Sequence, residues 1–293
     1  MHEITARSSR AIGRALRPSA ALLLAPGLLA ILFLFLWPLG QMVVFSFTDP
    51  SSGFGNYQRF FQTSSEVTSL VTTMKVSFIA TILCAIVGYI YAYTMTISSR
   101  LVSRLLMVAV VLPMGVSLLV RTFSLQAILR DTGLINQALI GIGLIKQPLP
   151  LIRNQFAVLV GIVSMELPFM VLPLYNTMVQ INKKLLLAGE GLGATPLRVF
   201  LDIFFPLSMP GLLAGSLIVY VSSLGYYVVP QLLGGGSQLF LSQDISNWVQ
   251  LQAEFGYGAA IGVILLILTL GTILVASLFI NIDKAFSQST GGK

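Results

Sequence analysis

The chain has very few of the residues that catalytic and metal sites most often use. Among its 293 residues there is one cysteine, Cys84, and one histidine, His2. A single cysteine excludes a disulfide within the chain. One histidine and one cysteine also leave no ligand set for a zinc site and no usable Ser-His-Asp triad. The sequence therefore favours a protein that does not catalyse a reaction itself.

Charged residues are scarce as well. They make up 9% of the chain, whereas 56% of the residues are hydrophobic, and the mean hydropathy is +0.89. An average soluble domain contains about 25% charged residues. The composition therefore indicates an integral membrane protein in contact with lipid. The net charge of +7 comes from basic residues spread over the ends of apolar segments rather than from one patch, so no nucleic-acid partner is expected.

Long apolar runs take up most of the chain. A membrane-spanning helix needs about 20 apolar residues. The sequence predicts six such spans, at 20–46, 70–97, 104–124, 154–178, 203–232 and 258–281. The first run follows four arginines, but it is too long for a signal-peptide core and lacks a clear cleavage site, so it is predicted to be retained. We therefore expect an all-α membrane protein with a basic arm at 1–19, a six-span domain at 20–281 and a tail at 282–293.

The distribution of lysine and arginine predicts the orientation. With the N-terminus inside, the inner segments carry eleven of these residues and the outer segments carry five. Positive residues concentrate on the cytoplasmic side of membrane proteins. Both termini are therefore predicted to be cytoplasmic, together with the connection between the fourth and fifth spans.

That connection is a polar segment, Asn182–Arg198, between two long apolar runs. Asn182 is suited to cap a short helix, and Gly193 is suited to end it. Thr195 followed by Pro196 is typical of the start of a second helix. Two interpretations follow: a structured knob that docks onto a partner at the membrane face, or a connecting loop without a partner.

The residues after the knob extend the pattern. Gly193 is followed by Ile203 and then by Pro206. This spacing resembles the cytoplasmic motif of ABC importer permeases, in which Glu-Ala-Ala, three residues, Gly, nine residues and Ile precede Leu-Pro. The resemblance covers 182–211. It departs in the first half, because Leu187-Ala188-Gly189 stands in the Glu-Ala-Ala place, and Glu190 is a candidate substitute for the missing acid.

Three further segments resemble the polyamine-type (spermidine/putrescine) permeases of this family. They are Leu119–Phe123, Leu167–Tyr175 and Leu224–Gly235, in the same order along the chain. The resemblance implies the type I importer permease fold, with six transmembrane helices and a coupling helix between spans four and five. It also implies a multi-pass protein of the cell inner (plasma) membrane.

The resemblance implies several partners. They are two ATPase subunits, a second permease subunit that is a different chain rather than a copy, and a soluble substrate-binding protein. The sequence contains no Gly-x4-Gly-Lys-Ser/Thr P-loop, so ATP and Mg²⁺ are expected on the ATPase subunits and no cofactor on this chain. The residues expected to couple to the ATPase are Leu185, Leu186, Leu187, Ala188, Glu190, Leu192, Gly193, Ala194 and Arg198.

Glu166 is the main candidate for the substrate path, because ionisable residues inside a span are functional candidates by default. It lies in the fourth span, two residues before Pro168. Its carboxylate is suited to pair with a cationic group of a substrate. Two alternatives remain: a bond to Ser, Tyr or a neighbouring subunit within the bundle, or a carboxyl group kept protonated by burial.

Other candidates for the path lie near the ends of spans three and five. Tyr226, Tyr227, Ser222 and Ser223 offer hydroxyl groups and rings, although for each residue taken singly simple packing is the favoured interpretation. Arg121 is suited either to hold an outer gate or to anchor the chain at the interface. Polyamine permeases carry acids near the fifth-span end where this chain has Tyr226 and Gln231, so a monoamine or an amino-acid-like solute is an alternative to a polyamine.

Two other classes of function remain as alternatives. A secondary transporter driven by an ion gradient needs titratable groups inside the membrane. Glu166 is the one such group predicted to lie deep, and no inverted repeat is evident in the sequence. An intramembrane enzyme is disfavoured by the lack of a usable histidine, of paired cysteines and of clustered aspartates.

Overall fold

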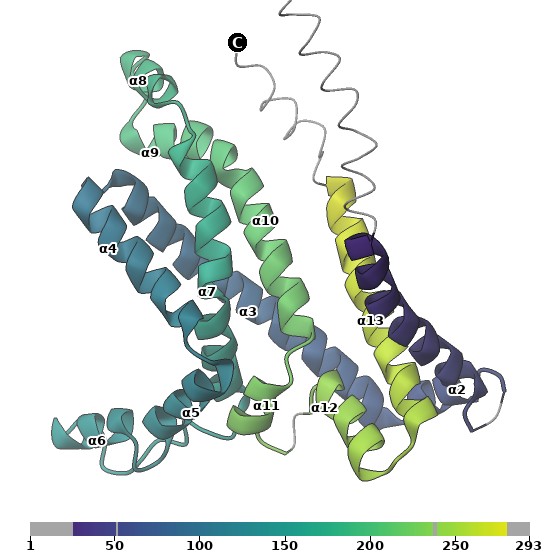
Figure 1. Cartoon of the computed structure of the whole chain (residues 1–293). Helices are drawn as coiled ribbons and strands as arrows, with labels where there is room; N and C mark the ends of the chain where they lie inside the picture. The colour runs from purple at the N-terminus through teal and green to yellow at the C-terminus, as the bar shows by residue number, and fades with distance from the viewer. Residues whose placement is uncertain (1–25, 51, 237–238, 280–293) are drawn as a thin grey trace, which may run out of the picture.

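The structure is a computed structural model, and it describes residues 26–50, 52–236 and 239–279. The N-terminal arm 1–19 and the C-terminal tail 282–293 of the sequence analysis lie outside the described residues. Within them the chain is helical (Figure 1). After the first helix, Pro26–Thr48, the α-helices are α2 (Gly55–Gln62), α3 (Ser64–Ile97), α4 (Arg100–Val111), α5 (Leu118–Leu129), α6 (Leu134–Gly141), α7 (Gln155–Val179), α8 (Lys183–Gly191), α9 (Pro196–Val199), α10 (Phe205–Leu224), α11 (Val228–Leu233), α12 (Leu241–Ser246) and α13 (Phe255–Phe279).

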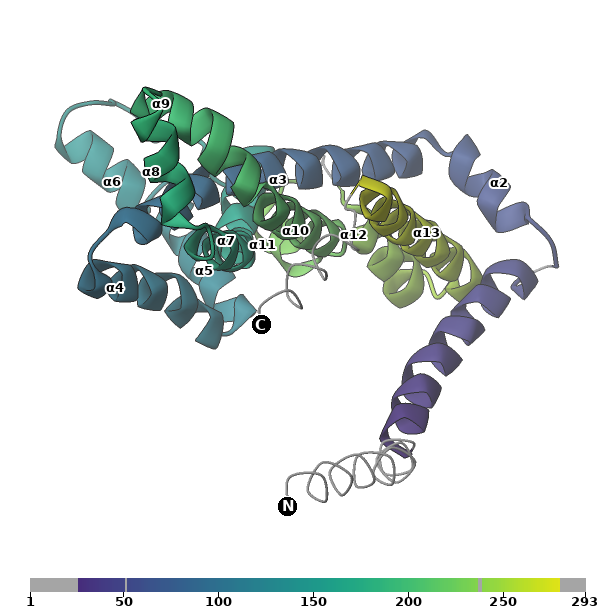
Figure 2. The same ribbon diagram turned by 90° about the horizontal axis from the view of Figure 1, so that it is seen from above.

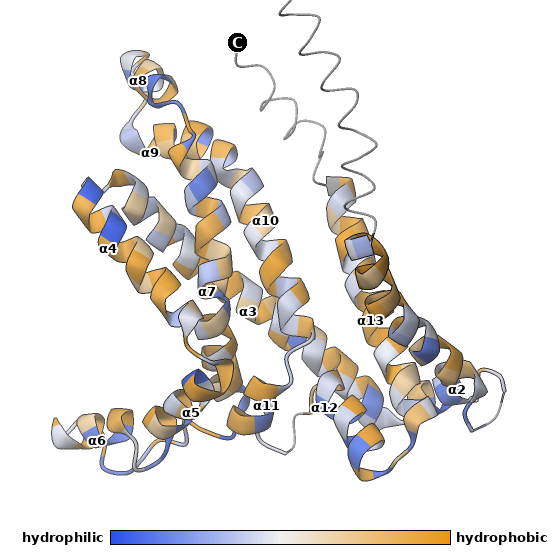
Figure 3. Ribbon diagram, in the orientation of Figure 1, coloured by the Kyte–Doolittle hydropathy of each residue, from blue (hydrophilic) through white to orange (hydrophobic). Residues whose placement is uncertain are grey.

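Five helical segments are long and apolar enough to cross a membrane. They are Pro26–Thr48, α3, α7, the continuous stretch Pro196–Leu224, and α13. A bent pair, Arg100–Gly115 with Leu118–Gly141, makes up to six if it counts as one span. Apolar residues cover most of these helices, whereas polar residues gather at their ends (Figure 3). The six-span architecture predicted from hydropathy is therefore confirmed.

The third predicted span, 104–124, is not one straight helix. α4 ends at Val111, a 3-10 turn follows at Leu112–Gly115, and the two parts of the bent pair meet at 104°. Pro113 lies in this turn, and its ring and missing N–H prevent a continuous α-helical hydrogen-bond ladder. α5 and α6 consequently run sideways at one end of the bundle (Figure 1).

The fifth predicted span, 203–232, ends earlier than expected. Its helix ends at Leu224, with Gly225 as the C-cap residue, and α11 is a separate short helix. The apolar character of the sequence continues through this break, so hydropathy alone did not locate it. The break places Tyr226 and Tyr227 in a connection beside the bundle rather than within a helix.

The core of the bundle is formed by α3, α7 and α10, which contact one another. In Figure 2 α7 and α10 are seen nearly end-on, and α3 runs across them. Small residues permit this close approach. A Cβ atom at Gly215 would lie 2.8 Å from Sδ of Met170, and one at Gly211 would lie 2.8 Å from the carbonyl oxygen of Pro173. The small-xxx-small spacing of Gly211 and Gly215 therefore serves helix contact, as is common in membranes.

α13 and the first helix form a second group. α13 packs against α2 and α12 around a cluster of Phe60, Leu241, Tyr257 and Ile261. Farther along α13, an apolar cleft of about 730 Å³ lies between this helix, α10 and α3. The helix Pro26–Thr48 runs away from the bundle in Figure 2. None of the residues in its most apolar stretch is buried. The protein thus consists of a packed helical core with more loosely attached outer helices.

The two ends of the bundle are named here by the short helices that mark them. The α8 end contains α8, α9 and the first turn of α4, and the α12 end contains α2, α5, α6, α11 and α12 (Figure 1). α3 has 34 residues and is about 51 Å long at 1.5 Å per residue. This exceeds the roughly 30 Å of a hydrocarbon core, and α3 runs obliquely to α7 and α10 in Figure 1.

Candidate functional site: the knob at the α8 end and the buried polar network

The knob at the α8 end has the local structure that its sequence predicts. The side chain of Asn182 accepts a hydrogen bond of 3.0 Å from the backbone N–H of Lys184 and caps α8. Gly193 has a φ of +86° and turns the chain after the helix, a backbone conformation that favours glycine. The side chain of Thr195 then accepts from the backbone N–H of Arg198 and caps α9, with Pro196 as its first residue. All three predicted helix signals are confirmed.

α8 rests on the start of the following spanning helix through Gly189. This glycine is buried, and a Cβ atom there would lie 2.7 Å from Cδ1 of Ile203 and 3.4 Å from Cγ2 of Val199. Leu186 packs against the bundle core on the same side. The contact between Gly189 and Ile203 joins the two halves of the motif described above, which are separated by the turn at Gly193.

The rest of the α8 surface is exposed. Leu185 is 48% exposed, Leu187 is 63% exposed, and Leu192, just after the helix, is 90% exposed. The other predicted coupling residues are placed as follows: Ala188, Glu190, Gly193 and Arg198 are exposed, and Ala194 is half-buried. The knob therefore displays apolar side chains on a capped helix, and Leu186 is the predicted coupling residue that faces the bundle instead.

A π-helical turn, Phe200–Phe204, joins α9 to α10. Pro206 follows it and has no N–H to donate into the ladder, which favours a wider turn at this point. Phe200 and Phe204 stack with a centroid separation of 5.8 Å, and Tyr93 packs edge-on against both. The sequence places Tyr93 and Phe204 in predicted spans without a role, so this aromatic support of the knob was missed.

Glu166 lies inside the subunit rather than on an open face. It is 1% exposed, and its Oε1 accepts a hydrogen bond of 2.7 Å from the hydroxyl of Tyr226. Its Oε2 is buried without a hydrogen-bond partner among the described residues. This arrangement corresponds to the alternative in which the carboxyl group bonds to a tyrosine within the bundle. Direct contact between Glu166 and a solute thus requires a rearrangement of its surroundings.

The remaining candidates for the path fall into two groups. Ser222 and Tyr227 are exposed. Ser223 is fully buried, and its hydroxyl donates to the carbonyl of Val219 in its own helix. Arg121 donates from Nη2 to the carbonyl oxygen of Ser164 at 2.7 Å, so it joins α5 to α7 close to Glu166. The structure thus brings Arg121, Glu166 and Tyr226 together and leaves Ser222 and Tyr227 at the surface.

Hydrogen bonds continue from Tyr226 into the α12 end. The carbonyl of Tyr226 accepts from the hydroxyl of Ser242 at 2.6 Å. Gln243 donates from Nε2 to Oε1 of Gln231 at 2.7 Å, and its own Oε1 accepts from the N–H of Phe240. Hydrogen bonds therefore connect the middle of α7 with α12 through Tyr226, and a separate pair joins α12 to α11.

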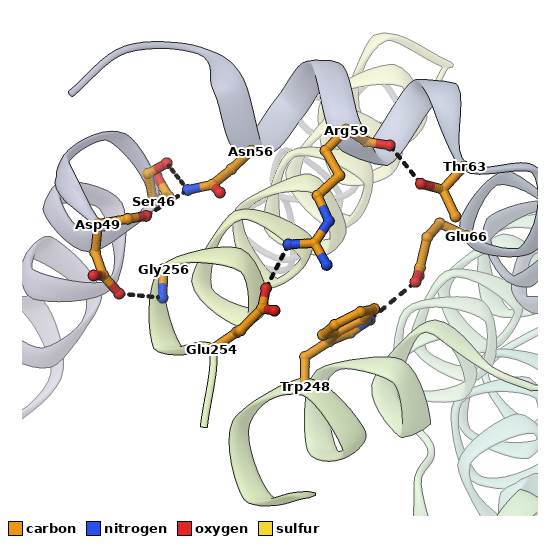
Figure 4. Close-up of polar contacts among 9 residues, drawn as sticks. All are labelled: Ser46, Asp49, Asn56, Arg59, Thr63, Glu66, Trp248, Glu254 and Gly256. Atoms are coloured by element: carbon orange, nitrogen blue, oxygen red, sulfur yellow. Dashed lines mark hydrogen bonds and ion pairs between the residues drawn. The ribbon is translucent and has the colours of Figure 1, made fainter. Parts of the chain in front are cut away.

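The α12 end also contains a buried acidic pair that the sequence analysis missed. Glu66 of α3 accepts from Nε1 of Trp248 at 2.9 Å (Figure 4). Asp244 of α12 is buried near it, and each acid has one buried carboxyl oxygen without a hydrogen-bond partner within the described chain. Burial raises the pKa of Asp244 to about 7; Ser69 opposes this shift, and the charge of Glu66 adds to it.

Contacts around this pair fasten α2 and the residue after the first helix to the start of α13. Arg59 pairs with Glu254 and lies 4.6 Å and 4.2 Å from the ring centroids of Trp248 and Tyr257. Asp49 accepts from the backbone N–H of Gly256 at 2.8 Å (Figure 4). These interactions hold α2 and α13 together at the α12 end.

Comparison with known families agrees with this architecture. Residues 85–284 match the family described as binding-protein-dependent transport system inner membrane component. The matched range includes the knob. The chain belongs to this family, and it is a transmembrane subunit of a binding-protein-dependent importer. This membership confirms the class of protein that the motif resemblance indicated, and it disfavours the ion-coupled transporter.

Two curated relatives illustrate the family. The chain is 33% identical over 196 residues to the spermidine/putrescine transport system permease protein PotB of Haemophilus influenzae, which covers 67% of this chain and 68% of PotB. It is 26% identical over 263 residues to the putative 2-aminoethylphosphonate transport system permease protein PhnU of Salmonella paratyphi A, covering 87% and 89% of the two chains.

Solved structures share the fold. A bacterial ABC transporter involved in the import of the acidic polysaccharide alginate matches with a TM-score of 0.72 at 18% identity, over 98% of this chain and 100% of the other. The MetNI methionine ABC transporter, in an inward-facing conformation, matches with a TM-score of 0.57 at 16% identity, over 73% and 93%. These likenesses confirm the importer permease fold.

Proposed function

We propose that this chain forms half of the membrane path of an ATP-driven importer and that α8 docks onto an ATPase subunit. The observation that carries the proposal is the exposed apolar surface of Leu185, Leu187 and Leu192 on a helix that is capped by Asn182 and anchored through Gly189. A nine-residue helix is marginal by itself, so docking would stabilise it further.

The complete importer contains several other chains under this proposal. Two ATPase subunits bind ATP and Mg²⁺, because this sequence has no P-loop of its own. A second permease subunit, a different chain, completes the path. A soluble binding protein delivers the solute. The bacterial alginate ABC transporter solved in complex with an alginate pentasaccharide-bound periplasmic protein supports this part of the proposal.

The proposed orientation puts the α8 end in the cytoplasm. It follows from the excess of lysine and arginine on that side, and it makes both termini cytoplasmic in the cell inner (plasma) membrane. ATP-driven closure of the ATPase subunits then moves α8. α7 and the π-helical turn Phe200–Phe204 transmit this movement into the bundle.

The proposed solute is a small polar molecule with an amino group. The names of PotB and PhnU specify spermidine or putrescine and 2-aminoethylphosphonate, and all of these molecules carry an amine. Ser222 and Tyr227 are the exposed candidates to line the path. Three further residues influence the path without lining it: Ser223, Arg121 and Glu166. Glu166 does so through its hydrogen bond to Tyr226.

The docking proposal is tested by mutation of the exposed face of α8. The double variant Leu185→Glu/Leu187→Glu is expected to lose the ATPase subunit on purification in mild detergent and to stop ATP-dependent uptake. The control is Leu144→Glu, a leucine that is 71% exposed and lies away from α8, and this variant is expected to retain the ATPase subunit. Retention by the double variant would overturn the docking role of α8.

A second experiment separates the roles of Glu166. The variant Glu166→Gln preserves an acceptor for the Tyr226 hydroxyl and removes the charge. If Glu166 only holds Tyr226 in place, the affinity of the importer for the solute is unchanged in this variant. A large loss of affinity would instead place its carboxylate on the solute. Uptake that continues in vesicles without ATP would contradict the importer and revive the ion-coupled alternative.

A further inference from the structure

A large cleft lies at the α8 end between the knob and the ends of three other helices. Its volume is about 920 Å³, within the range of ligand sites. It is bounded by the last turns of α3 and α7, the first turns of α4, and α8 with α9. The cleft borders the exposed surface of α8, because Leu187 and Glu190 are among its lining residues whereas Leu185 is not.

Three basic residues line the cleft. Arg100 and Arg104 lie one turn apart at the start of α4, and Lys183 is the first residue of α8. Glu190 is the acidic residue of the lining. Within the described part of the chain, the ion pair found is Arg59 with Glu254, at the α12 end. The excess positive charge of the cleft is thus not neutralised by these residues.

The rest of the lining has two parts. Hydroxyl groups lie beside the arginines, and Ser103 and Tyr175 share a hydrogen bond of 3.1 Å there. Apolar side chains cover the other wall, including Met178, Val179 and Phe204. The lining is therefore amphiphilic, with a basic rim that continues into an apolar wall.

The position of the cleft fits that chemistry. It lies where the long spanning helices α3 and α7 end, which is the level at which a membrane changes from hydrocarbon to headgroups. In Figure 3 polar residues at the tip of α4 give way to apolar ones along its length. Basic pockets between spanning helices on the cytoplasmic side are suited to the headgroups of anionic lipids.

We propose that this cleft binds an anionic phospholipid, with its phosphate held by Arg100, Arg104 and Lys183 and its acyl chain along Val179 and its apolar neighbours. The site uses residues of both α4 and α8, so a bound headgroup would bridge the knob to the bundle. Binding of a lipid in this cleft is separate from the proposed transport role, since it can be measured without ATP hydrolysis.

The experiment uses the importer complex that contains the full chain, delipidated in detergent and examined by native mass spectrometry. Phosphatidylglycerol is added in one series and phosphatidylcholine in another. A basic residue near a membrane surface contributes about 1 kcal/mol to anionic lipid binding, so Arg100→Gln/Arg104→Gln should weaken phosphatidylglycerol binding about 30-fold. The effect should shrink as ionic strength rises.

Two controls make the result specific. Lys184→Gln removes a neighbouring exposed charge that does not line the cleft, and it should leave binding unchanged. Arg100→Lys/Arg104→Lys retains the charges and should restore most of the affinity. Equal melting temperatures of all variants in phosphatidylcholine would show that the fold is intact, and both arginines are exposed, so no loss of folding is expected.

Three results would overturn the proposal. One is equal binding of phosphatidylglycerol by the double glutamine variant and the wild type. Another is equal binding of phosphatidylcholine and phosphatidylglycerol by the wild type. The third is displacement of the lipid by inorganic phosphate at equal concentration, which would identify a site for free anions rather than for a lipid.

Discussion

The hydroxyl of Tyr226 and the carboxyl group of Glu166 form a hydrogen bond of 2.7 Å between residues sixty positions apart. Glu166 belongs to α7, whose far end leads into the knob, and Tyr226 belongs to the connection that precedes α11 and α12. This bond is therefore a direct link between the spanning helix that carries α8 and the opposite end of the bundle.

The first prediction concerns this link. Tyr226→Phe should lower the free energy of unfolding by about 1–3 kcal/mol, because it leaves both carboxyl oxygens of Glu166 buried without a partner. Thermal unfolding in detergent measures the change. Tyr227→Phe is the matched control, since the Tyr227 hydroxyl is exposed and contacts Ser246 at 3.2 Å. An equal effect of both variants would contradict the special role of Tyr226.

The second prediction is a pH dependence at the α12 end. Burial raises the pKa of Asp244 to about 7 from its ordinary value of 3.8. Between these values the folded protein binds more protons than the unfolded chain, so the stability from this group is complete below about pH 4. It is lost as the pH rises through 7, with a slope of at most about 1.4 kcal/mol per pH unit.

Melting curves of the wild type and of Asp244→Asn at several pH values test this dependence. The asparagine variant cannot ionise, so its stability relative to the wild type should rise from pH 5 to pH 8. Asp49→Asn provides a comparison, because Asp49 bonds to Gly256 at the same end of the bundle. Parallel curves for wild type and Asp244→Asn would show that Asp244 does not titrate in this range.

The third prediction uses the two glycines of α8. Gly189→Leu should displace α8 from Ile203 and lower ATP-dependent uptake more than tenfold, because the space at 189 is already filled. Gly191 has open space beside it, since a Cβ atom there would meet no heavy atom within 4 Å. Gly191→Ala should therefore stabilise α8 by up to about 1 kcal/mol without loss of uptake. Hydrogen exchange of 183–191 and uptake assays together distinguish the two effects.

The fourth prediction concerns the contact between α7 and α10. Gly215→Leu should destabilise the fold by about 1–3 kcal/mol, since the added atoms would meet both the side chain and the backbone of Met170. Gly271→Leu is the control, because its position on α13 has no heavy atom within 4 Å of a Cβ. If the two variants melt alike, close packing at Gly215 does not limit stability.

The structure of the knob was predictable because its signals are local. The caps formed by Asn182 and Thr195, and the left-handed turn at Gly193, depend on residues at most three positions away. Side-chain capping and glycine conformation act over that range in any sequence context. The motif spacing then indicated the family, and the match over residues 85–284 confirmed it.

The break after α4 was not predictable from hydropathy. The run 104–124 is apolar throughout, and hydropathy does not record the direction of a helix axis. Pro113 permits a bend, but prolines 168, 173 and 210 lie inside helices that continue through them. Whether a proline ends a helix depends on the neighbours that pack around the freed backbone groups.

The sequence by itself determined that this chain enters a membrane, how many apolar segments it has, and where the capped knob lies. These properties follow from composition and from contacts between near neighbours. Tertiary structure alone decided the direction in which each face points: Leu186 inward, Leu187 outward, and Glu166 onto Tyr226. It also assembled the basic cleft, because Arg104 and Lys183 are brought together only when α4 packs beside the end of α7. Such placements depend on the simultaneous packing of helices far apart in the chain, which no local pattern specifies.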